Sequence, residues 1–298
     1  MNVLSLFDGM SCAQIALERC NITVDNYFSS EIKPHAIHVT QKNFPNTIQV
    51  GDINFITKET FGAHKIDLLV GGSPCQSFSR SGDNSGFDGK SGLFYEYIRL
   101  LKELRSLNPN IKFFLENVIM SKVWENEISS LLGVSPIKVN SKLVSAQNRN
   151  RLYWTNIEGF QMPIDLKITL KDILQNVSKI PIDNKGLIYF SEGEYRIKNA
   201  TIKGFLPVNN YDSVSLDFPN SKTRRGRVAV QKVSTLTTSC SQALFLKGAC
   251  YKLTPVECER LQNIPDDYTS SVSEYKRRDL IGDGWTIDVI VEFFKHLK

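Results

Sequence analysis

Short apolar runs alternate with amphipathic segments through the first half of the chain. The apolar runs are typical of buried strands, and we expect strands at residues 3–7, 27–30, 66–70, 111–115, 137–144 and 151–157. The amphipathic segments predict helices at residues 12–20, 34–44 and 93–105, and Pro34 suits the first position of its helix. This alternation predicts an α/β fold with a mostly parallel sheet and helices on both of its faces.

The pattern weakens after residue 174. Residues 178–250 are rich in Asn, Gly, Ser and Thr and contain only short strand-like pieces, such as 187–190 and 228–230. Helical patterns return at 254–261 and 287–297, and we expect those segments to pack back on the sheet. We therefore predict a larger domain over residues 1–178, completed by 276–298, and a smaller irregular domain over 179–275.

Composition narrows the class of protein only slightly. The hydrophobic content of 41% and the charged content of 22% are ordinary for a folded chain. No apolar run approaches the ~20 residues that cross a bilayer, and the chain enters a strand pattern at once, so we expect a cytoplasmic protein without a membrane partner. Six cysteines without Cys-x-x-Cys spacing favour neither a metal site nor a disulfide framework.

The net charge of +5 is compatible with a polyanionic partner. Basic residues gather in Lys222-Thr-Arg224-Arg225-Gly-Arg227 and in Lys276-Arg277-Arg278. Solvated surface runs explain each cluster equally well.

Candidate ligand-binding residues follow the first three predicted strands. Phe7-Asp8-Gly9 leads from the first strand into the first helix, where a glycine lets a ligand approach backbone amides. Glu31 ends the second strand, about 20 residues on, where an acid can accept both hydroxyls of a ribose. Asp52 stands where the next strand should end. These acids outline a pocket for an adenosine-containing cofactor, although a full dinucleotide fingerprint is missing.

Further along the chain, three motifs carry candidate chemistry. In Pro74-Cys75-Gln76, Cys75 follows a buried strand and two glycines, so it is either a nucleophile or a small buried filler. Glu116 emerges from an apolar strand and suits a group that shares a proton, with a structural helix cap as the alternative. Arg149 and Arg151 alternate, so an extended segment would turn both guanidiniums to one face.

Together these motifs resemble those of the DNA (cytosine-5)-methyltransferases, in family order and over most of the chain. To the elements already described the resemblance adds Gln147-x-Arg149-x-Arg151, Ser234-Thr235-Leu236-Thr237, Leu253-Thr254-Pro-x-Glu257, Pro265-Asp266 and Gly282-Asp283-Gly284-Trp285. It departs from the family where Met10, Ser11 and Cys12 replace a further glycine, where Asp283 replaces Asn, and near Trp285, where a small aliphatic residue is usual.

The resemblance implies an S-adenosylmethionine-dependent methyltransferase fold with a target-recognition domain, and methyl transfer to cytosine C5 in a specific duplex DNA sequence. Cys75 would attack C6 of a flipped-out base, Glu116 would hold N3 and the amino group, Arg149 would contact the base carbonyl and position Glu116, and Arg151 would support the catalytic loop. The implied cofactor residues are Phe7, Asp8, Gly9, Glu31, Ile32, Asp52, Ile53, Pro74, Leu93, Asp283 and Trp285. The implied DNA-binding residues are Gln76, Ser77, Ser79, Arg80, Gln147, Arg224, Arg225, Arg227 and Thr235.

The resemblance also implies a monomer in a bacterial cell or a phage-infected host, with a cognate restriction endonuclease as a candidate partner. Two alternatives stay open: a tRNA cytosine-5 methyltransferase on the same scaffold, and a catalytically silent DNA-binding relative. The segment between Gln147 and Leu253 is long enough to read DNA, which favours the DNA enzyme over the first alternative. The presence of Cys75, Glu116 and Arg149 argues against the second.

Overall fold

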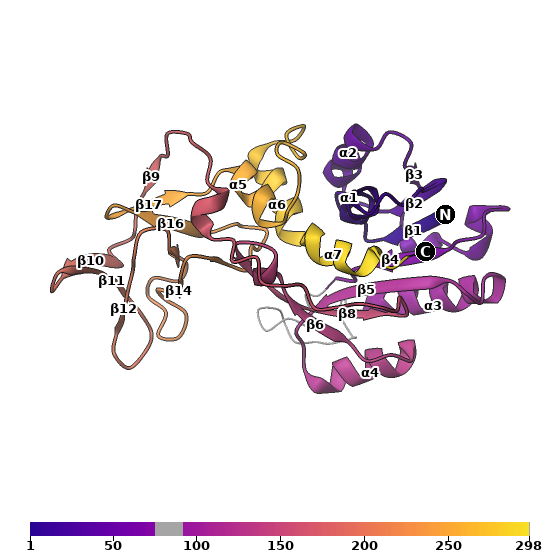
Figure 1. Cartoon of the computed structure of the whole chain (residues 1–298), viewed down its shortest axis with the longest axis horizontal. Coiled ribbons are helices and arrows are strands. Elements are labelled where there is room, and N and C mark those ends of the chain that lie inside the picture. The colour runs from indigo at the N-terminus through magenta and orange to yellow at the C-terminus, as the bar shows by residue number, and fades with distance from the viewer. Residues whose placement is uncertain (75–91, 298) are drawn as a thin grey trace. The chain divides into compact units, whose positions relative to one another are not determined.

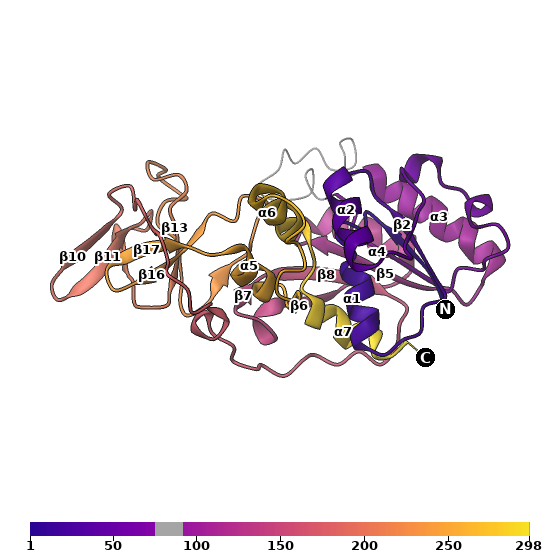
Figure 2. The ribbon, with the colours of Figure 1, turned by 90° about the horizontal axis from the view of Figure 1, so that it is seen from above.

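The chain divides into two compact units in a computed structural model that describes residues 1–74 and 92–297 (Figures 1 and 2). The first unit comprises Met1–Asn140, Asn150–Pro163 and Ile287–Lys298, and the second comprises Ser141–Arg149 and Ile164–Thr286. No helix among the described residues combines the length and the apolar character needed to cross a lipid bilayer.

A seven-stranded sheet forms the centre of the first unit, in the order β3-β2-β1-β4-β5-β8-β6. Its first five strands along this order pair in parallel, whereas β8 runs antiparallel to both β5 and β6. The strands are β1 (Asn2–Leu6), β2 (Asn26–Ser30), β3 (Ile48–Gln49), β4 (Leu68–Gly71), β5 (Lys112–Val118), β6 (Ile137–Asn140) and β8 (Asn150–Thr155). The predicted α/β fold with a mostly parallel sheet is confirmed.

The described helices of this unit are α1 (Cys12–Arg19), α2 (Pro34–Asn43), α3 (Leu93–Leu107), α4 (Lys122–Leu132) and α7 (Ile287–Phe294). Pro34 opens α2 as predicted. The helix α4 was not predicted from the sequence, and only Ile128 and Leu132 of it are buried. The strand expected over 137–144 is wrong in its second half, where a 3-10 turn over Ser141–Leu143 follows β6.

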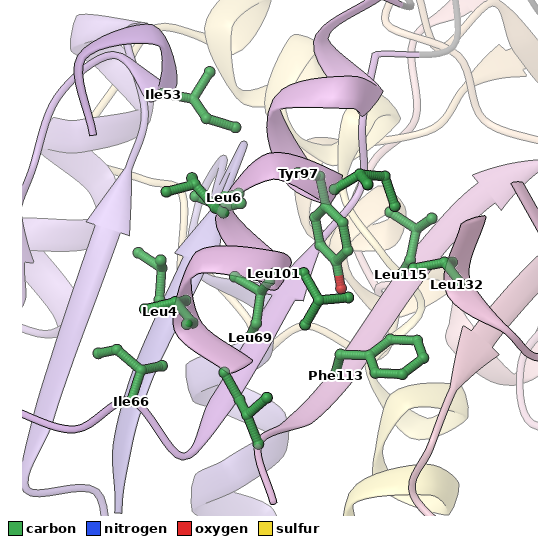
Figure 3. Close-up of a cluster of buried hydrophobic side chains, with 14 of the residues drawn as sticks. Leu4, Leu6, Ile53, Ile66, Leu69, Tyr97, Leu101, Phe113, Leu115 and Leu132 are labelled. Carbon is green, nitrogen blue, oxygen red and sulfur yellow. The ribbon is translucent and has the colours of Figure 1, made fainter. Parts of the chain in front are cut away.

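The core of the first unit lies between the sheet and α3 (Figure 3). Leu4, Leu69 and Phe113, from three neighbouring strands, pack with Tyr97 and Leu101 of α3, and all five side chains are almost fully buried. The hydroxyl of Tyr97 donates a hydrogen bond to the Phe114 carbonyl at 3.2 Å.

Gly71 and Phe114 explain how closely the helices approach the sheet. A Cβ at Gly71 would lie 3.1 Å from the Tyr97 ring, so a larger residue at the end of β4 would push α3 away. The ring of Phe114 contacts Phe293 and Phe294 of α7, each at 5.2 Å between centroids. The sheet is thus covered on both faces, as its nearly continuous apolar strands require.

The second unit is built from short, mostly antiparallel strands. A five-stranded sheet has the order β14-β13-β16-β17-β9, a three-stranded sheet the order β10-β11-β12, and β15 pairs in parallel with β7. Val214, Ala243 and Phe245 lie in its core. The strands are β7 (Gln147–Asn148), β9 (Pro181–Ile182), β10 (Ile188–Ser191), β11 (Glu194–Lys198), β12 (Phe205–Pro207), β13 (Ser213–Ser215), β14 (Val228–Ala229), β15 (Val233–Ser234), β16 (Gln242–Leu246) and β17 (Ala249–Lys252).

Two helices complete the second unit, α5 (Pro255–Leu261) and α6 (Glu274–Asp283). The limits of the second unit differ from the domain boundaries predicted at residues 178 and 276. The unit includes residues before 178, among them β7, which pairs with β15, and α6 spans residue 276. The functional division into a catalytic and a target-recognition domain stays a prediction.

Removal of a side chain from the core should weaken the first unit strongly. We expect Leu101→Ala to lower the free energy of unfolding by about 2–5 kcal/mol, because Leu101 is 1% exposed and its loss leaves a cavity. Leu107, at the end of the same helix, is 53% exposed, so Leu107→Ala should lower the free energy of unfolding by less than about 1 kcal/mol. Urea unfolding of both variants measures the difference, and equal losses would contradict the core described here.

Candidate active site

The carboxyl ends of the parallel strands bring most of the predicted site residues of the first unit to one edge of the sheet. Phe7 follows β1, Glu31 follows β2, and Pro74 comes shortly after β4. Glu116 belongs to this edge because the preceding residue, Leu115, pairs with Gly71 at the end of β4. Open α/β sheets bind their ligands at this edge.

Glu31 is held in place by three backbone amides. Its Oε2 accepts a hydrogen bond from the Gly9 N–H, and its Oε1 accepts from Ile32 and Lys33, all at 2.8 Å. Gly9 has a φ of +58°, and a Cβ there would meet no atom within 4 Å. A fixed negative charge therefore stands at the end of β2, connected to a loop that has open space in front of its glycine.

Asp8 points into the protein. Its carboxylate accepts hydrogen bonds from Ser11, from the Tyr27 hydroxyl at 2.7 Å and from the Ser29 hydroxyl at 2.9 Å. Burial raises the pKa of Asp8 above its ordinary value and raises the pKa of Tyr27 well above its own. Asp8 thus supports the loop from inside, and its place among the cofactor residues stays a prediction.

Asp52, Ile53 and Leu93 surround the next part of the edge. Asp52 Oδ1 accepts from the Asn54 amide at 2.9 Å and from its side chain at 2.8 Å, and so caps a short 3-10 helix over Ile53–Phe55. Ile53 is 4% exposed and belongs to the core, whereas Leu93 opens α3 and is half-buried. Ile53 therefore supports Asp52 from beneath.

Glu116 forms a buried ion pair with Arg151. Arg151 Nε lies 2.7 Å from Glu116 Oε1, and the side chains are only 13% and 11% exposed. Arg151 pairs with Val118 and Glu116 with Tyr153 across β5 and β8, so both side chains share one face as diagonal neighbours. Among the described residues Glu116 Oε1 has no hydrogen-bond partner, so the contact is ionic without hydrogen-bond alignment.

The alternative function of Glu116 as a helix cap is wrong. Glu116 lies inside β5, and the next helix, α4, has Ser121 at its N-cap position. Because the carboxylate is buried beside an arginine and does not cap a helix, a chemical role is the better explanation of its position.

Asn117 is a site residue that the sequence analysis did not single out. It is 1% exposed, and its Nδ2 donates to the Ser73 hydroxyl at 3.0 Å and to the Ser73 carbonyl at 3.3 Å. These bonds tie the end of β5 to the residues that directly precede Pro74. The signal was present in the polar pair Glu116-Asn117, which breaks an otherwise apolar strand.

Arg149 has surroundings different from those predicted. It is 3% exposed and donates to the carbonyls of Leu236 at 3.0 Å, Gly284 at 2.9 Å and Gly282 at 3.3 Å, all within the second unit. The ion pair with Glu116 is made by Arg151, for which only support of the catalytic loop was expected, and the role of Arg149 in positioning Glu116 stays a prediction. Alternation does not hold here because β7 ends at Asn148 and β8 begins at Asn150, which leaves Arg149 at a break between strands.

Gln147 is not available to DNA, which corrects its prediction as a DNA-binding residue. It is fully buried, and its side chain donates to the Leu261 carbonyl at 3.0 Å and to Gln262 Oε1 at 3.1 Å and accepts from the Leu236 amide at 2.9 Å. Nearby, the Thr235 hydroxyl donates to the Asn148 carbonyl at 2.9 Å, so it fixes the β7–β15 pairing.

The remaining predicted residues fall in three groups. Asp283 ends α6, and Trp285 follows the helix, so the motif Gly282-Asp283-Gly284-Trp285 is partly helical. Gly282 is required there, because a Cβ would come within 2.4 Å of the Thr237 backbone. Cys75, Gln76, Ser77, Ser79 and Arg80 lie outside the described residues.

The third group is the arginines between β13 and β14, Arg224, Arg225 and Arg227. Arg224 and Arg227 are exposed, whereas Arg225 is only partly exposed and its Nε donates to the Asn199 carbonyl at 3.1 Å. Contact of these arginines with DNA stays a prediction.

Gly226 fastens two loops of the second unit to one another. The first, residues 199–204, joins β11 to β12, and the second, residues 216–227, joins β13 to β14. Asn199 Nδ2 donates to the Gly226 carbonyl at 2.6 Å. The φ of Gly226 is +59°, and a Cβ there would lie 1.9 Å from the Lys198 carbonyl oxygen, so no other residue fits.

A parallel sheet with the order β3-β2-β1-β4-β5 and acidic residues beside the carboxyl ends of its strands defines an α/β enzyme that binds a nucleoside-containing cofactor. Comparison with known proteins identifies the family. The family described as C-5 cytosine-specific DNA methylase matches residues 1–128. The type II methyltransferase M1.ScrFI of Lactococcus lactis subsp. cremoris is 30% identical over 97% of this chain and 75% of its own.

The type II methyltransferase M.HhaI of Haemophilus parahaemolyticus is 26% identical over 97% of this chain and 92% of its own. The chain therefore belongs to the C-5 cytosine-specific DNA methylase family, whose members use S-adenosylmethionine to methylate cytosine at C5 in DNA.

Solved structures show the same fold. The Entamoeba histolytica methyltransferase EhMeth has a TM-score of 0.72 at 16% identity and covers 100% of this chain and 97% of its own. An Escherichia coli prophage protein described as a DNA modification methyltransferase has a TM-score of 0.69 at 22% identity, with 100% and 98% coverage.

The Glu116–Arg151 pair should show strong energetic coupling. Because each charge is buried, we expect Arg151→Met and Glu116→Gln each to cost about 3 kcal/mol of unfolding free energy. The double variant should cost clearly less than the sum, since it leaves no unpaired charge. Urea unfolding of the four proteins measures the coupling.

The ion pair Arg19–Asp288, with side chains 35% and 37% exposed, is the matched control, and its removal should cost at most about 1 kcal/mol. Additive losses for the buried pair would contradict the coupling.

Proposed function

We propose that this chain transfers a methyl group to C5 of cytosine within a specific sequence of duplex DNA, with Cys75 as the nucleophile and the Glu116–Arg151 pair as its partner at the base. The observation that carries the proposal is the buried carboxylate of Glu116, fixed by Arg151 in the strand that neighbours β4. β4 ends at Gly71, the sequence continues as Gly-Ser-Pro-Cys75, and Asn117 holds this segment at Ser73.

Cytosine C5 is too weak a nucleophile to take a methyl group directly. The Cys75 thiolate forms a bond to C6, and the electron pair of the C5–C6 double bond then makes C5 nucleophilic. Glu116 shares a proton with N3 and accepts a hydrogen bond from the exocyclic amino group, so that the shared proton offsets the negative charge that develops on the ring when the thiolate adds. Arg151 holds the Glu116 carboxylate in position in a buried place.

After C5 has gained its new carbon–carbon bond, a water molecule or hydroxide removes the C5 proton. The electron pair of the broken C–H bond restores the double bond and expels the Cys75 thiolate. The target base must leave the helix stack for this chemistry, because its C6 is inaccessible inside a duplex.

The residues at the sheet edge fit S-adenosylmethionine, which supplies the methyl group as part of a sulfonium. The open space at Gly9 allows close approach to the backbone, and the held carboxylate of Glu31 suits ribose hydroxyls. Ile32 is 69% exposed directly beside Glu31 and offers an apolar surface to a purine ring. Phe7, Asp52, Pro74 and Leu93 complete the proposed set in the first unit, and Asp283 and Trp285 stay predictions from the family resemblance.

The proposed biological setting is that of the relatives. The names of M1.ScrFI and M.HhaI describe type II methyltransferases, which supports a modification enzyme with a cognate restriction endonuclease. The Bacillus phage SPR protein, 30% identical over 69% of this chain, is described as an orphan methyltransferase, which favours an enzyme without such a partner. A monomer in the cytoplasm of a bacterium or of a phage-infected host suits both settings.

Cys75→Ala should abolish methyl transfer while DNA binding persists, because only the nucleophile is removed. The measurement is incorporation of label from S-adenosylmethionine into unmethylated DNA and into bulk tRNA, with Cys20→Ala as a control that should stay active. Label in DNA as 5-methylcytosine, dependent on Cys75, supports the proposal. Full turnover by Cys75→Ala would contradict the mechanism, and label in tRNA alone would contradict the substrate.

Glu31→Ala should weaken S-adenosylmethionine binding about ten- to a hundredfold, the effect of losing a charge-assisted hydrogen bond. Binding of DNA without the cofactor should change little. Isothermal titration of the cofactor and fluorescence anisotropy of labelled DNA separate the two effects. Glu18→Ala, an exposed acid on α1, is the control for loss of charge. Equal weakening of both ligands would remove Glu31 from the cofactor site.

A further inference from the structure

Residues 7–11, which we call the β1–α1 loop, have an unusual backbone. Phe7, Gly9 and Ser11 have φ angles of +56°, +58° and +62°, so every second residue of the loop lies in the left-handed region. Glycine adopts this conformation freely, whereas a larger residue brings its Cβ too close to the neighbouring backbone. Phe7 and Ser11 are therefore strained, and such strain persists only where surrounding contacts hold it.

The side chain of Ser11 is held by the interior of the protein. Ser11 is fully buried, its amide donates to the Asp8 carbonyl at 3.0 Å, and its hydroxyl donates to the Asp8 carboxylate. The same hydroxyl lies 3.1 Å from the Thr40 hydroxyl of α2 and accepts from Gln14 Nε2 at 3.3 Å. A serine before a helix ordinarily caps it by accepting from a helical amide, but the Ser11 side chain makes no such bond to α1. Its hydroxyl therefore serves the contact with Asp8.

Asp8 connects Ser11 to β2 at a cost in stability. Among the described residues, the contacts of its carboxylate are all with hydroxyl groups, including those of Tyr27 and Ser29 on β2. Burial raises the pKa of Asp8, so the folded protein disfavours the ionised carboxylate, and its contribution to stability falls as the pH rises past that pKa. A buried acid that weakens the folded state points to a role other than stability.

The contact between Asp8 and Ser11 fixes the residue that lies between them. The Gly9 amide donates to Glu31 Oε2 at 2.8 Å, and the Gly9 carbonyl accepts from the Thr40 hydroxyl at 3.4 Å. If the backbone at Ser11 left the left-handed region, Gly9 would move and its bond to Glu31 would be disturbed. Two buried side chains thus determine the position of an open glycine and of a carboxylate at the edge of the sheet.

We propose that Asp8 and Ser11 are positioning residues for S-adenosylmethionine, because their buried contact holds the β1–α1 loop in its binding geometry before the cofactor arrives. This inference rests on the proposed function and deepens it, since it assigns cofactor affinity to two buried side chains that act through Gly9 and Glu31. Without the contact the strained backbone relaxes, and only a fraction of the molecules presents the binding geometry. The apparent affinity then falls by that fraction.

The first experiment compares two replacements of Ser11 by isothermal titration with S-adenosylmethionine. Both Ser11→Ala and Ser11→Gly remove the hydroxyl, but only glycine adopts the left-handed conformation without strain. Ser11→Ala should weaken cofactor binding about five- to thirtyfold, the cost of one left-handed residue, and Ser11→Gly should recover most of this loss. The control is Ser106→Ala, an exposed serine on α3, which should bind the cofactor like the wild type.

The second experiment tests whether Asp8 acts through Ser11. Tyr27→Phe removes one hydroxyl that holds the Asp8 carboxylate, and it should weaken cofactor binding about two- to tenfold. In the presence of Ser11→Gly the same change should have little effect, because a glycine at position 11 no longer depends on Asp8. Losses that simply add in the double variant would contradict this coupling.

Methyl transfer and DNA binding separate positioning of the cofactor from general damage to the fold. In Ser11→Ala the loss should appear in the KM for S-adenosylmethionine much more than in kcat, and the affinity for DNA without the cofactor should match the wild type. Cofactor binding that Ser11→Ala leaves unchanged, or an equal loss in Ser11→Gly, would overturn this inference alone. Absence of cofactor binding by the wild type would overturn the proposed function and this inference with it.

Discussion

The antiparallel pairing of β5 with β8 is the constraint on which the candidate active site depends. If β8 were shifted by one residue, Arg151 would move to the opposite face of the sheet and Glu116 would be left as an unpaired buried charge. The register is fixed by the core, since Phe114 contacts α7 and Trp154 is fully buried on β8. Hydrophobic packing thus places two charges that water would otherwise separate.

The elements with strong local signals could be predicted from the sequence. The parallel strands are short apolar runs, α3 has a regular apolar stripe, and the acids at 31 and 52 come at or close behind strand ends, so their common edge followed from topology alone. Glu31 and Glu116 could therefore be identified from the order of residues along the chain. The other site residues were predicted from the order of the family motifs along the chain. The similarity to known methyltransferases supports this family assignment.

Features that arise from tertiary contacts could not be predicted in this way. Neither the break between β7 and β8 nor the burial of Gln147 can be recognised from local periodicity, so the ion pair of Arg151 with Glu116 and the buried contacts of Gln147 were not predicted. The second unit was the hardest part of the fold to predict, because its strands of two to five residues contain too few positions for an alternating pattern to be recognised. Its order depends instead on individual side chains such as Asn199 and Arg225.

Gly226 has a consequence for how this chain can diverge from its relatives. Since the Lys198 carbonyl occupies the space of any side chain at that position, the backbone of one loop cannot shift unless the other moves with it. Insertions in either loop alone would break the fastening, whereas exchange of both segments as a single cassette would preserve it. Evolutionary change, or a deliberate graft from another protein, is therefore expected to replace residues 199–204 and 216–227 together.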